Sequence, residues 1–206
     1  MIHWLIDSGH GGIDPLNCEP VTPGKRSPVF PEGSEFEGQR LIEGVRNRAV
    51  VNYLSLLLDQ DGFKYTLICD TWKDCPLEVR TTKANQLIRK NPNEKFFFVS
   101  IHHNAFRGDW NDANGVSCHI FPNSKTGRIL AESFQRELVR STGLKSRGIK
   151  ENTFFVLRKT ICPAVLTENG FMTNLKDASF AMSEEGSKKI AEGHFNAIKQ
   201  IEKTLK

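Results

Sequence analysis

Apolar and polar residues follow two patterns along the chain, which predict strands and helices in turn. Continuous apolar runs bounded by turn residues are typical of strands buried on both faces, and apolar residues that recur every three to four positions are typical of helices. The expected strands span residues 2–7, 63–69, 95–101, 116–121, 153–157 and 163–168. The expected helices span residues 41–58, 77–90, 124–142 and 183–203. This alternation predicts an α/β fold: a single domain over residues 1–206 with a mostly parallel mixed sheet flanked by helices on both faces.

The most apolar run begins at Phe96 and predicts the central strand, which is followed at once by His102, His103 and Asn104. Ligands in open α/β sheets gather at the carboxyl ends of strands, so these histidines stand where chemistry is expected. Because neighbouring side chains on a strand point to opposite faces, we expect only one of the two histidines to join a shared site.

Three other predicted elements carry polar groups toward the same edge. Residues 8–12, Ser-Gly-His-Gly-Gly, follow the first strand, and their glycines allow a sharp turn that presents His10. An ordinary glycine-rich turn explains this segment equally well. Glu168 ends the last strand, and Glu43 lies in the first turn of the first helix, where the helix dipole alone favours a carboxylate. His119, on the strand predicted at 116–121, is expected to be a packed or rim histidine.

The candidate residues together suit metal chemistry. Two imidazoles and a carboxylate, from His10, His102 and Glu43, make a donor set that fits a catalytic zinc with an open fourth position. Such a metal lowers the pKa of bound water toward ~7, and a further carboxylate such as Glu168 can act as general base. A Cys–His nucleophilic site is the competing chemistry, but no cysteine lies at a strand-end turn beside a histidine.

Composition limits the class of protein. The chain has 206 residues with 25% charged and 38% hydrophobic residues and a net charge of +4, as in ordinary globular proteins. No dense Lys/Arg block indicates nucleic-acid binding, and no run approaches the ~20 apolar residues of a membrane span. The five cysteines are irregularly spaced, which favours reduced thiols over a disulfide framework. Residues 1–7 resemble a strand rather than a signal peptide, so we expect a protein that is cytoplasmic when made.

Residues 14–40 do not fit the alternating pattern. They contain five prolines and scattered charges, which predict a long loop or an inserted element. A loop of this length inside a compact domain is often a functional rim or lid. A passive insertion is the alternative.

The motifs, taken in order, resemble the zinc-dependent N-acetylmuramoyl-L-alanine amidases, peptidoglycan hydrolases often called type-3 amidases. Six segments in family order carry the resemblance: Ile6–Gly12, Glu43–Leu58, Leu77–Asn85, Ser100–Ala105, Arg147–Arg158 and Pro163–Asn174. The first is similar to the family's Asp-x-Gly-His-Gly-Gly signature. The fourth is similar to Ser-x-His-x-Asn-Ala, which selects His102 rather than His103. The chain departs from the family at Cys69, where a Thr-Arg pair is usual, and after Gly12, where a short Asp-Pro-Gly continuation is usual.

The resemblance implies cleavage of the amide between N-acetylmuramic acid and the L-alanine of the stem peptide, on a phosphorylase/hydrolase-like fold. It implies a Zn²⁺ ion held by His10, Glu43 and His102, with zinc-bound water as nucleophile and Glu168 as general base. Asp7 and Asn104 are expected either to orient these ligands or to act as loop caps.

Two other functions stay open at this point, namely a zinc peptidase that cuts within the stem peptide and a non-catalytic wall-binding module of the same fold. The expected partner is peptidoglycan, and the protein is expected to be a monomer. An endolysin of a phage, which is made in the cytoplasm and reaches the cell wall at lysis, fits these expectations.

Overall fold

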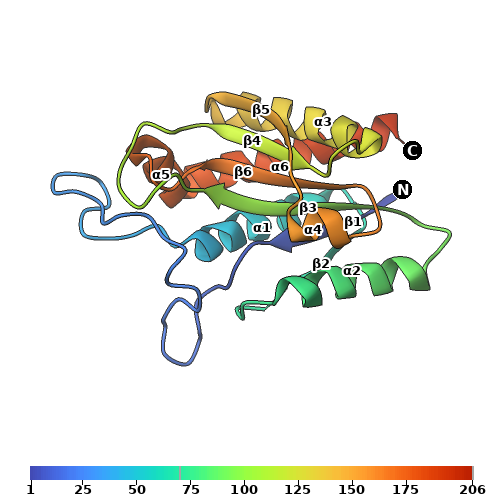
Figure 1. Ribbon diagram of the computed structural model, residues 1–206, viewed down its shortest axis with the longest axis horizontal. Helices are drawn as coiled ribbons and strands as arrows, with labels where there is room; N and C mark the ends of the chain where they lie inside the picture. The colour runs from blue at the N-terminus through green and yellow to red at the C-terminus, as the bar shows by residue number, and fades with distance from the viewer. Residues whose placement is uncertain (70, 206) are drawn as a thin grey trace.

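The computed structural model describes residues 1–69 and 71–205, in which one six-stranded sheet has helices on both faces (Figure 1). The strands are β1 (Ile2–Ser8), β2 (Tyr65–Leu67), β3 (Lys95–Asn104), β4 (Val116–Ile120), β5 (Ser146–Glu151) and β6 (Ala164–Phe171). The helices are α1 (Glu43–Gln60), α2 (Leu77–Lys90), α3 (Lys125–Thr142), α4 (Phe155–Lys159), α5 (Leu175–Met182) and α6 (Glu184–Thr204). The predicted fold class is confirmed.

The strand order is β2-β1-β3-β6-β4-β5, and β3 and β6 occupy the centre. All neighbouring strands are parallel except β4 and β6, which are antiparallel, so the sheet is mixed as expected. Glu168 on β6 pairs with His102 on β3 and with Ser117 on β4. These three side chains therefore share one face of the sheet.

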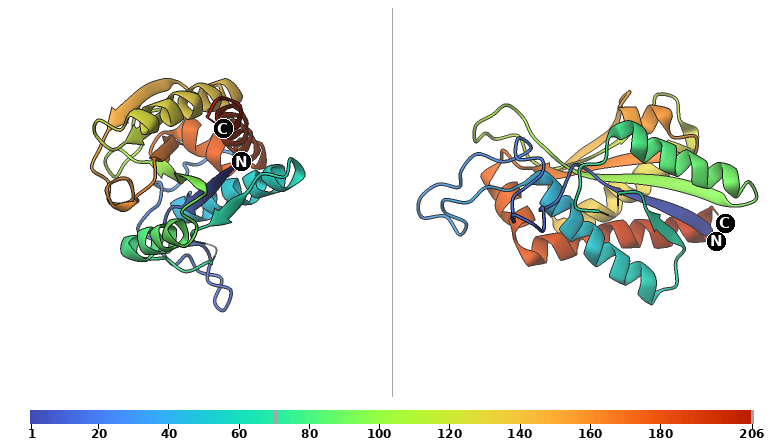
Figure 2. Two further views of the ribbon diagram at one scale, coloured as in Figure 1. Left: turned by 90° about the vertical axis from the view of Figure 1, so that its right-hand side faces the viewer. Right: turned by 90° about the horizontal axis from the view of Figure 1, so that it is seen from below.

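Alternating side chains of the central strands build two apolar layers. Trp4 and Phe97 lie on the face that packs against α1, α3 and α6. Leu5 and Phe98 lie on the opposite face, against α2 and α4. The right-hand view of Figure 2 shows the strands between these two groups of helices. The candidate chemistry of His102 and Glu168 lies on the face of α2 and α4, beyond the ends of both helices.

The segment from residue 14 to residue 40 lies at the carboxyl end of β1 and β3, away from both chain termini (Figure 1). Its second half is anchored by a third apolar cluster, in which Phe30 and Leu41 are buried with Met172. The indole of Trp110 packs edge-on against Phe30, with ring centroids 5.2 Å apart. Part of this segment is thus integrated into the fold by apolar packing.

One predicted strand is wrong, and two elements were not predicted. The strand predicted at 153–157 is instead the short helix α4, and the strand that pairs with β4 is β5, which the sequence analysis did not predict. The apolar run at 154–157 resembles a buried strand, but Val156 and Leu157 pack onto the sheet from a helix. Helix α5 was also not predicted; the Asn174 side chain caps it by accepting a hydrogen bond from the Asp177 N–H. No helix among the described residues has the length and apolar character needed to cross a bilayer.

Candidate metal centre and active site

The three predicted ligands meet at the carboxyl ends of β1 and β3. One carboxylate oxygen of Glu43 lies 3.1 Å from His10 Nε2, and the other lies 2.9 Å from His102 Nδ1. One donor atom from each residue lies within 4.8 Å of the others, and no other set of this kind occurs in residues 1–69 and 71–205. The two imidazoles meet edge to face, with ring centroids 5.1 Å apart. Residues far apart in sequence therefore form one compact donor cluster.

Glycines around His10 allow the close approach of the three segments. His10 has φ of 60°, a left-handed conformation that histidine tolerates better than most residues. A Cβ atom on Gly9 would lie 2.2 Å from Cε1 of His102, and one on Gly44 would lie 1.9 Å from the carbonyl oxygen of Gly11. The loop, the start of α1 and the end of β3 thus touch at positions where a side chain has no room.

Glu43 is the first residue of α1 and is almost completely buried. Burial acts to raise its pKa, but hydrogen bonds from His10 and His102 outweigh burial, so the pKa of Glu43 is lowered from its ordinary value. Burial acts to lower the pKa of His102, and the hydrogen bond to Glu43 reverses this and raises it. The site therefore favours an ionised carboxylate between two imidazoles.

His103 points to the opposite face of the sheet, as strand alternation predicts. Its Nδ1 lies 2.8 Å from the side-chain oxygen of Asn47 on α1, and the Asn47 amide donates to the carbonyl of Gly9 at 3.1 Å. Burial lowers the pKa of His103 to about 4, so this ring is neutral near pH 7. Sequence reasoning missed Asn47, which joins α1 to the loop that carries His10.

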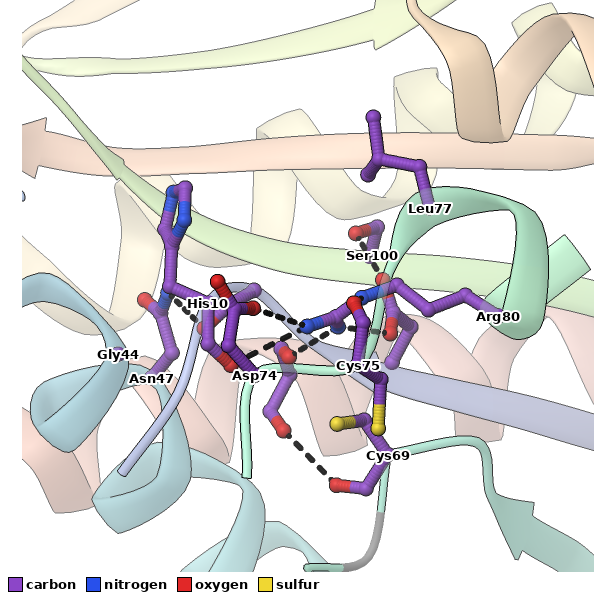
Figure 3. Close-up of polar contacts among 12 residues, drawn as sticks. His10, Gly44, Asn47, Cys69, Asp74, Cys75, Leu77, Arg80 and Ser100 are labelled. Carbon is purple, nitrogen blue, oxygen red and sulfur yellow. Dashed lines mark hydrogen bonds and ion pairs between the residues drawn. The ribbon is translucent and has the colours of Figure 1, made fainter. Parts of the chain in front are cut away.

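Arg80 on α2 holds the ends of β1 and its loop together (Figure 3). Its Nη1 donates at 2.6 Å both to a carboxylate oxygen of Asp7 and to the carbonyl of Ser8. Its Nη2 lies 3.2 Å from the carbonyl of His10. The second oxygen of Asp7 accepts from the Ser100 hydroxyl at 2.6 Å. This buried network fixes the backbone on both sides of Gly9.

The two residues expected to orient ligands behave differently. Asp7 accepts from Arg80, which also donates to the carbonyl of His10, so Asp7 is linked to the His10 loop through Arg80. The Asn104 side chain accepts from the N–H of Ala105 at 2.8 Å, which is the arrangement of a loop cap. His119 is packed: its ring nitrogens lie 3.1 Å from the Ser117 hydroxyl and 2.7 Å from the Asn152 amide.

Glu168 lies beside His102 but, unlike Glu43, has a side-chain oxygen that makes no hydrogen bond within residues 1–69 and 71–205. Its Oε2 is buried without a hydrogen-bond partner among the described residues. Burial raises the pKa of Glu168 to about 8, although the charge of His102 opposes the rise. The next residue, Asn169, donates from its amide to the carbonyl of His102 at 2.9 Å and ties the two strands together. A carboxyl group of this kind is suited to accept and release a proton.

Residues 21–27 brace the cluster directly. The Thr22 hydroxyl oxygen accepts from the N–H of Gly11 at 2.9 Å, and the carbonyl of Lys25 accepts from the N–H of Glu43 at 2.9 Å. The Ser27 hydroxyl accepts from the N–H of Leu41 at 2.9 Å. This part of the proline-rich segment contacts the carriers of two predicted ligands.

A cavity of about 210 Å³ lies beside the donor cluster. His10 and His102 form one wall, and Asp74, Cys75 and Leu77 lie on the side of α2. The cavity therefore brings solvent to the two imidazoles.

The donor set fits zinc. Imidazole nitrogen and carboxylate oxygen are ordinary zinc ligands, and a set of three protein donors is typical of catalytic sites. The donor atoms of the three residues lie close enough together to hold one metal ion. An α/β sheet with this donor set and a second carboxylate, that of Glu168, at its strand ends defines a candidate metal-dependent hydrolase.

Sequence comparison identifies the family. The family profile described as N-acetylmuramoyl-L-alanine amidase matches residues 5–200, and the chain belongs to this family of peptidoglycan amidases. N-acetylmuramoyl-L-alanine amidase CwlM of Bacillus licheniformis is 35% identical over 199 residues, which cover 96% of this chain and 68% of that protein. The uncharacterized protein YqiI of Bacillus subtilis (strain 168) is 31% identical over 195 residues, covering 94% of this chain and 81% of YqiI. The predicted enzyme class is confirmed.

Solved structures share the fold. The crystal structure of N-acetylmuramoyl-L-alanine amidase from Clostridium difficile 630 superposes with a TM-score of 0.79 at 25% identity and covers 100% of this chain and 99% of its own. The amidase AmiC2 of Nostoc punctiforme gives a TM-score of 0.75 at 26% identity, with 98% of this chain and 97% of AmiC2 covered. The six-stranded architecture is therefore that of the family.

Proposed function

We propose that the protein cleaves the amide between N-acetylmuramic acid and L-alanine with a zinc ion held by His10, Glu43 and His102. Glu168 is the general base in this proposal. One observation carries it: the donor atoms of the three ligands lie within 4.8 Å of one another, and Glu168 stands in register beside His102.

Zinc in such a site supplies Lewis acidity and makes water a nucleophile at neutral pH. The chain supplies the remaining functions. The two imidazole nitrogens and the Glu43 carboxylate already lie together. Arg80 and Asn47 donate to backbone carbonyls of the loop that carries His10. The unpaired oxygen of Glu168 takes a proton from the attacking water and returns it to the nitrogen of the leaving alanine.

Mass spectrometry of the products of peptidoglycan sacculi tests the proposal. Purified protein should release stem peptides with a free L-alanine amino terminus, chelation should stop the release, and added zinc should restore it. Activity that resists chelation, or that returns only with another metal, would contradict the zinc assignment. Products cut inside the stem peptide would be consistent with the metal site but would show that a different bond is cleaved, as in the zinc-peptidase alternative.

Three finer expectations stay predictions: that the protein is a monomer, that it is made in the cytoplasm and that it is a phage endolysin. The catalytic domain of the CD27L endolysin shares the fold with a TM-score of 0.63, but at 21% identity this similarity concerns the fold alone.

A further inference from the structure

Two cysteine side chains meet beside the candidate active site. The thiols of Cys69 and Cys75 are neighbours, and Figure 3 shows their sulfur atoms side by side below Arg80. Both are free thiols; Cys69 is buried and Cys75 is partly exposed.

Positive charge surrounds the pair. Nη2 of Arg48 lies 3.4 Å from Sγ of Cys69, and Nε of Arg80 donates to the carbonyl of Cys75 at 2.7 Å. The thiolate is the reactive form in thiol–disulfide exchange. Burial raises the pKa of the Cys75 thiol to about 11, and the neighbouring Cys69 adds to the rise.

Small molecules can reach both sulfur-bearing side chains. Cys75 lines the cavity of about 210 Å³ that also contains His10 and His102. Cys69 lines a separate cavity of about 420 Å³. The pair thus lies between two cavities.

We propose that Cys69 and Cys75 are an oxidation site, at which a low-molecular-weight disulfide converts the two thiols into one intramolecular disulfide. One thiolate attacks the reagent RSSR, forms a mixed disulfide and releases RS⁻. The second cysteine loses its proton and attacks the protein sulfur of that mixed disulfide, and the second RS⁻ leaves. The two protein thiols are oxidised, and RSSR is reduced to two RSH.

The cross-link would restrain a segment that contacts the loop of His10. The carbonyl of Trp72 accepts from the N–H of Gly12 at 2.7 Å, and the carbonyl of Cys75 accepts from Arg80. Closing a covalent ring between residues 69 and 75 stabilises these contacts by restricting the unfolded chain. The physiological setting rests on the proposed function, because an enzyme that acts on peptidoglycan works outside the reducing cytosol.

The experiment treats folded, reduced protein with oxidised glutathione, blocks the remaining thiols by alkylation and measures intact mass. Trypsin cleaves after Lys73, between the two cysteines, so the disulfide should join peptides 65–73 and 74–80 until a reductant is added. We expect two fewer alkylated thiols than in untreated protein. Full alkylation after oxidation, or glutathione that remains attached to Cys75, would overturn the proposal.

Variants and thermal unfolding provide the controls. Cys75→Ala and Cys69→Ser should each abolish the linked peptides, whereas Cys18→Ser and Cys162→Ser should leave them unchanged. Oxidation should raise the unfolding midpoint of the wild type by about 4–8 °C and leave that of Cys75→Ala unchanged. An equal midpoint for oxidised and reduced wild type would contradict the proposed restraint. None of these measurements depends on peptidoglycan hydrolysis, so they separate this proposal from the proposed function.

Discussion

The candidate metal ligands and the candidate base lie at the same end of the sheet but differ in their hydrogen bonding. Glu43 bonds to both histidines, and the loop of His10 is fixed by Arg80 and Asn47. Glu168 keeps a buried oxygen without a partner among residues 1–69 and 71–205. Ligands of a metal gain from fixed positions, whereas a group that exchanges protons needs a free lone pair. The fixed ligand His102 on β3 and the carboxylate of Glu168 on β6 therefore lie on neighbouring strands.

Replacing the free carboxylate should give the largest effect. Glu168→Gln keeps the size of the side chain and removes its basicity, so we expect hydrolysis of sacculi to fall by about 10²- to 10⁴-fold. Zinc content measured by atomic absorption should equal that of the wild type, because Glu168 makes no bond to the donor cluster. Loss of zinc from this variant would show that Glu168 is a ligand.

Breaking the buried network should mainly reduce stability. Arg80→Met leaves the Asp7 carboxylate buried with Ser100 as its remaining side-chain partner, and we expect a loss of about 3–5 kcal/mol in the free energy of unfolding. Denaturant unfolding measures this loss. The matched control is the double variant Asp7→Asn with Arg80→Met, which removes both charges and should recover part of the stability. A double variant no more stable than Arg80→Met would contradict the charge-pair explanation.

Crowding the donor cluster should weaken metal binding directly. A methyl group on Gly9 collides with the His102 ring, so Gly9→Ala should lower zinc affinity by about 10- to 100-fold in a competition titration. Gly24→Ala is the matched control, because a Cβ atom there meets nothing within 4 Å. Equal zinc affinity in the two variants would show that the loop of His10 moves to accommodate the added methyl group.

The smallest effect is expected from a substitution in residues 21–27, which contact the loop of His10 and the start of α1. Thr22→Val removes the acceptor of the Gly11 N–H and should cost about 1 kcal/mol in zinc binding or unfolding. Deleting residues 14–19 should leave zinc affinity unchanged, because the bracing contacts begin at Val21, whose N–H donates to the carbonyl of Gly12 at 3.1 Å. A loss of zinc on that deletion would show that residues 14–19 also support the metal site.

Strand-end reasoning was sufficient to bring His10 and His102 together, whereas the choice of Glu43 depended on the family resemblance. Parallel strands place their carboxyl ends together, and alternation along β3 selects His102 over His103, as the structure shows. Periodicity failed at residues 154–157, because a short apolar run fits a strand and a buried helical turn equally well. The supporting contacts of Arg80, Asn47 and Thr22 were not predictable, since each depends on which backbone groups are left unpaired elsewhere in the fold.

The position of β6 has a consequence for how the protein becomes active during synthesis. This strand is the last to be made, yet it lies between β3 and β4 at the centre of the sheet and carries Glu168. A nascent chain that ends before residue 164 leaves those two strands without their common neighbour. Sheet closure and delivery of the proton-transfer group are then the same late, long-range event. A chain that ends before residue 164 therefore has neither a complete sheet nor the proposed general base.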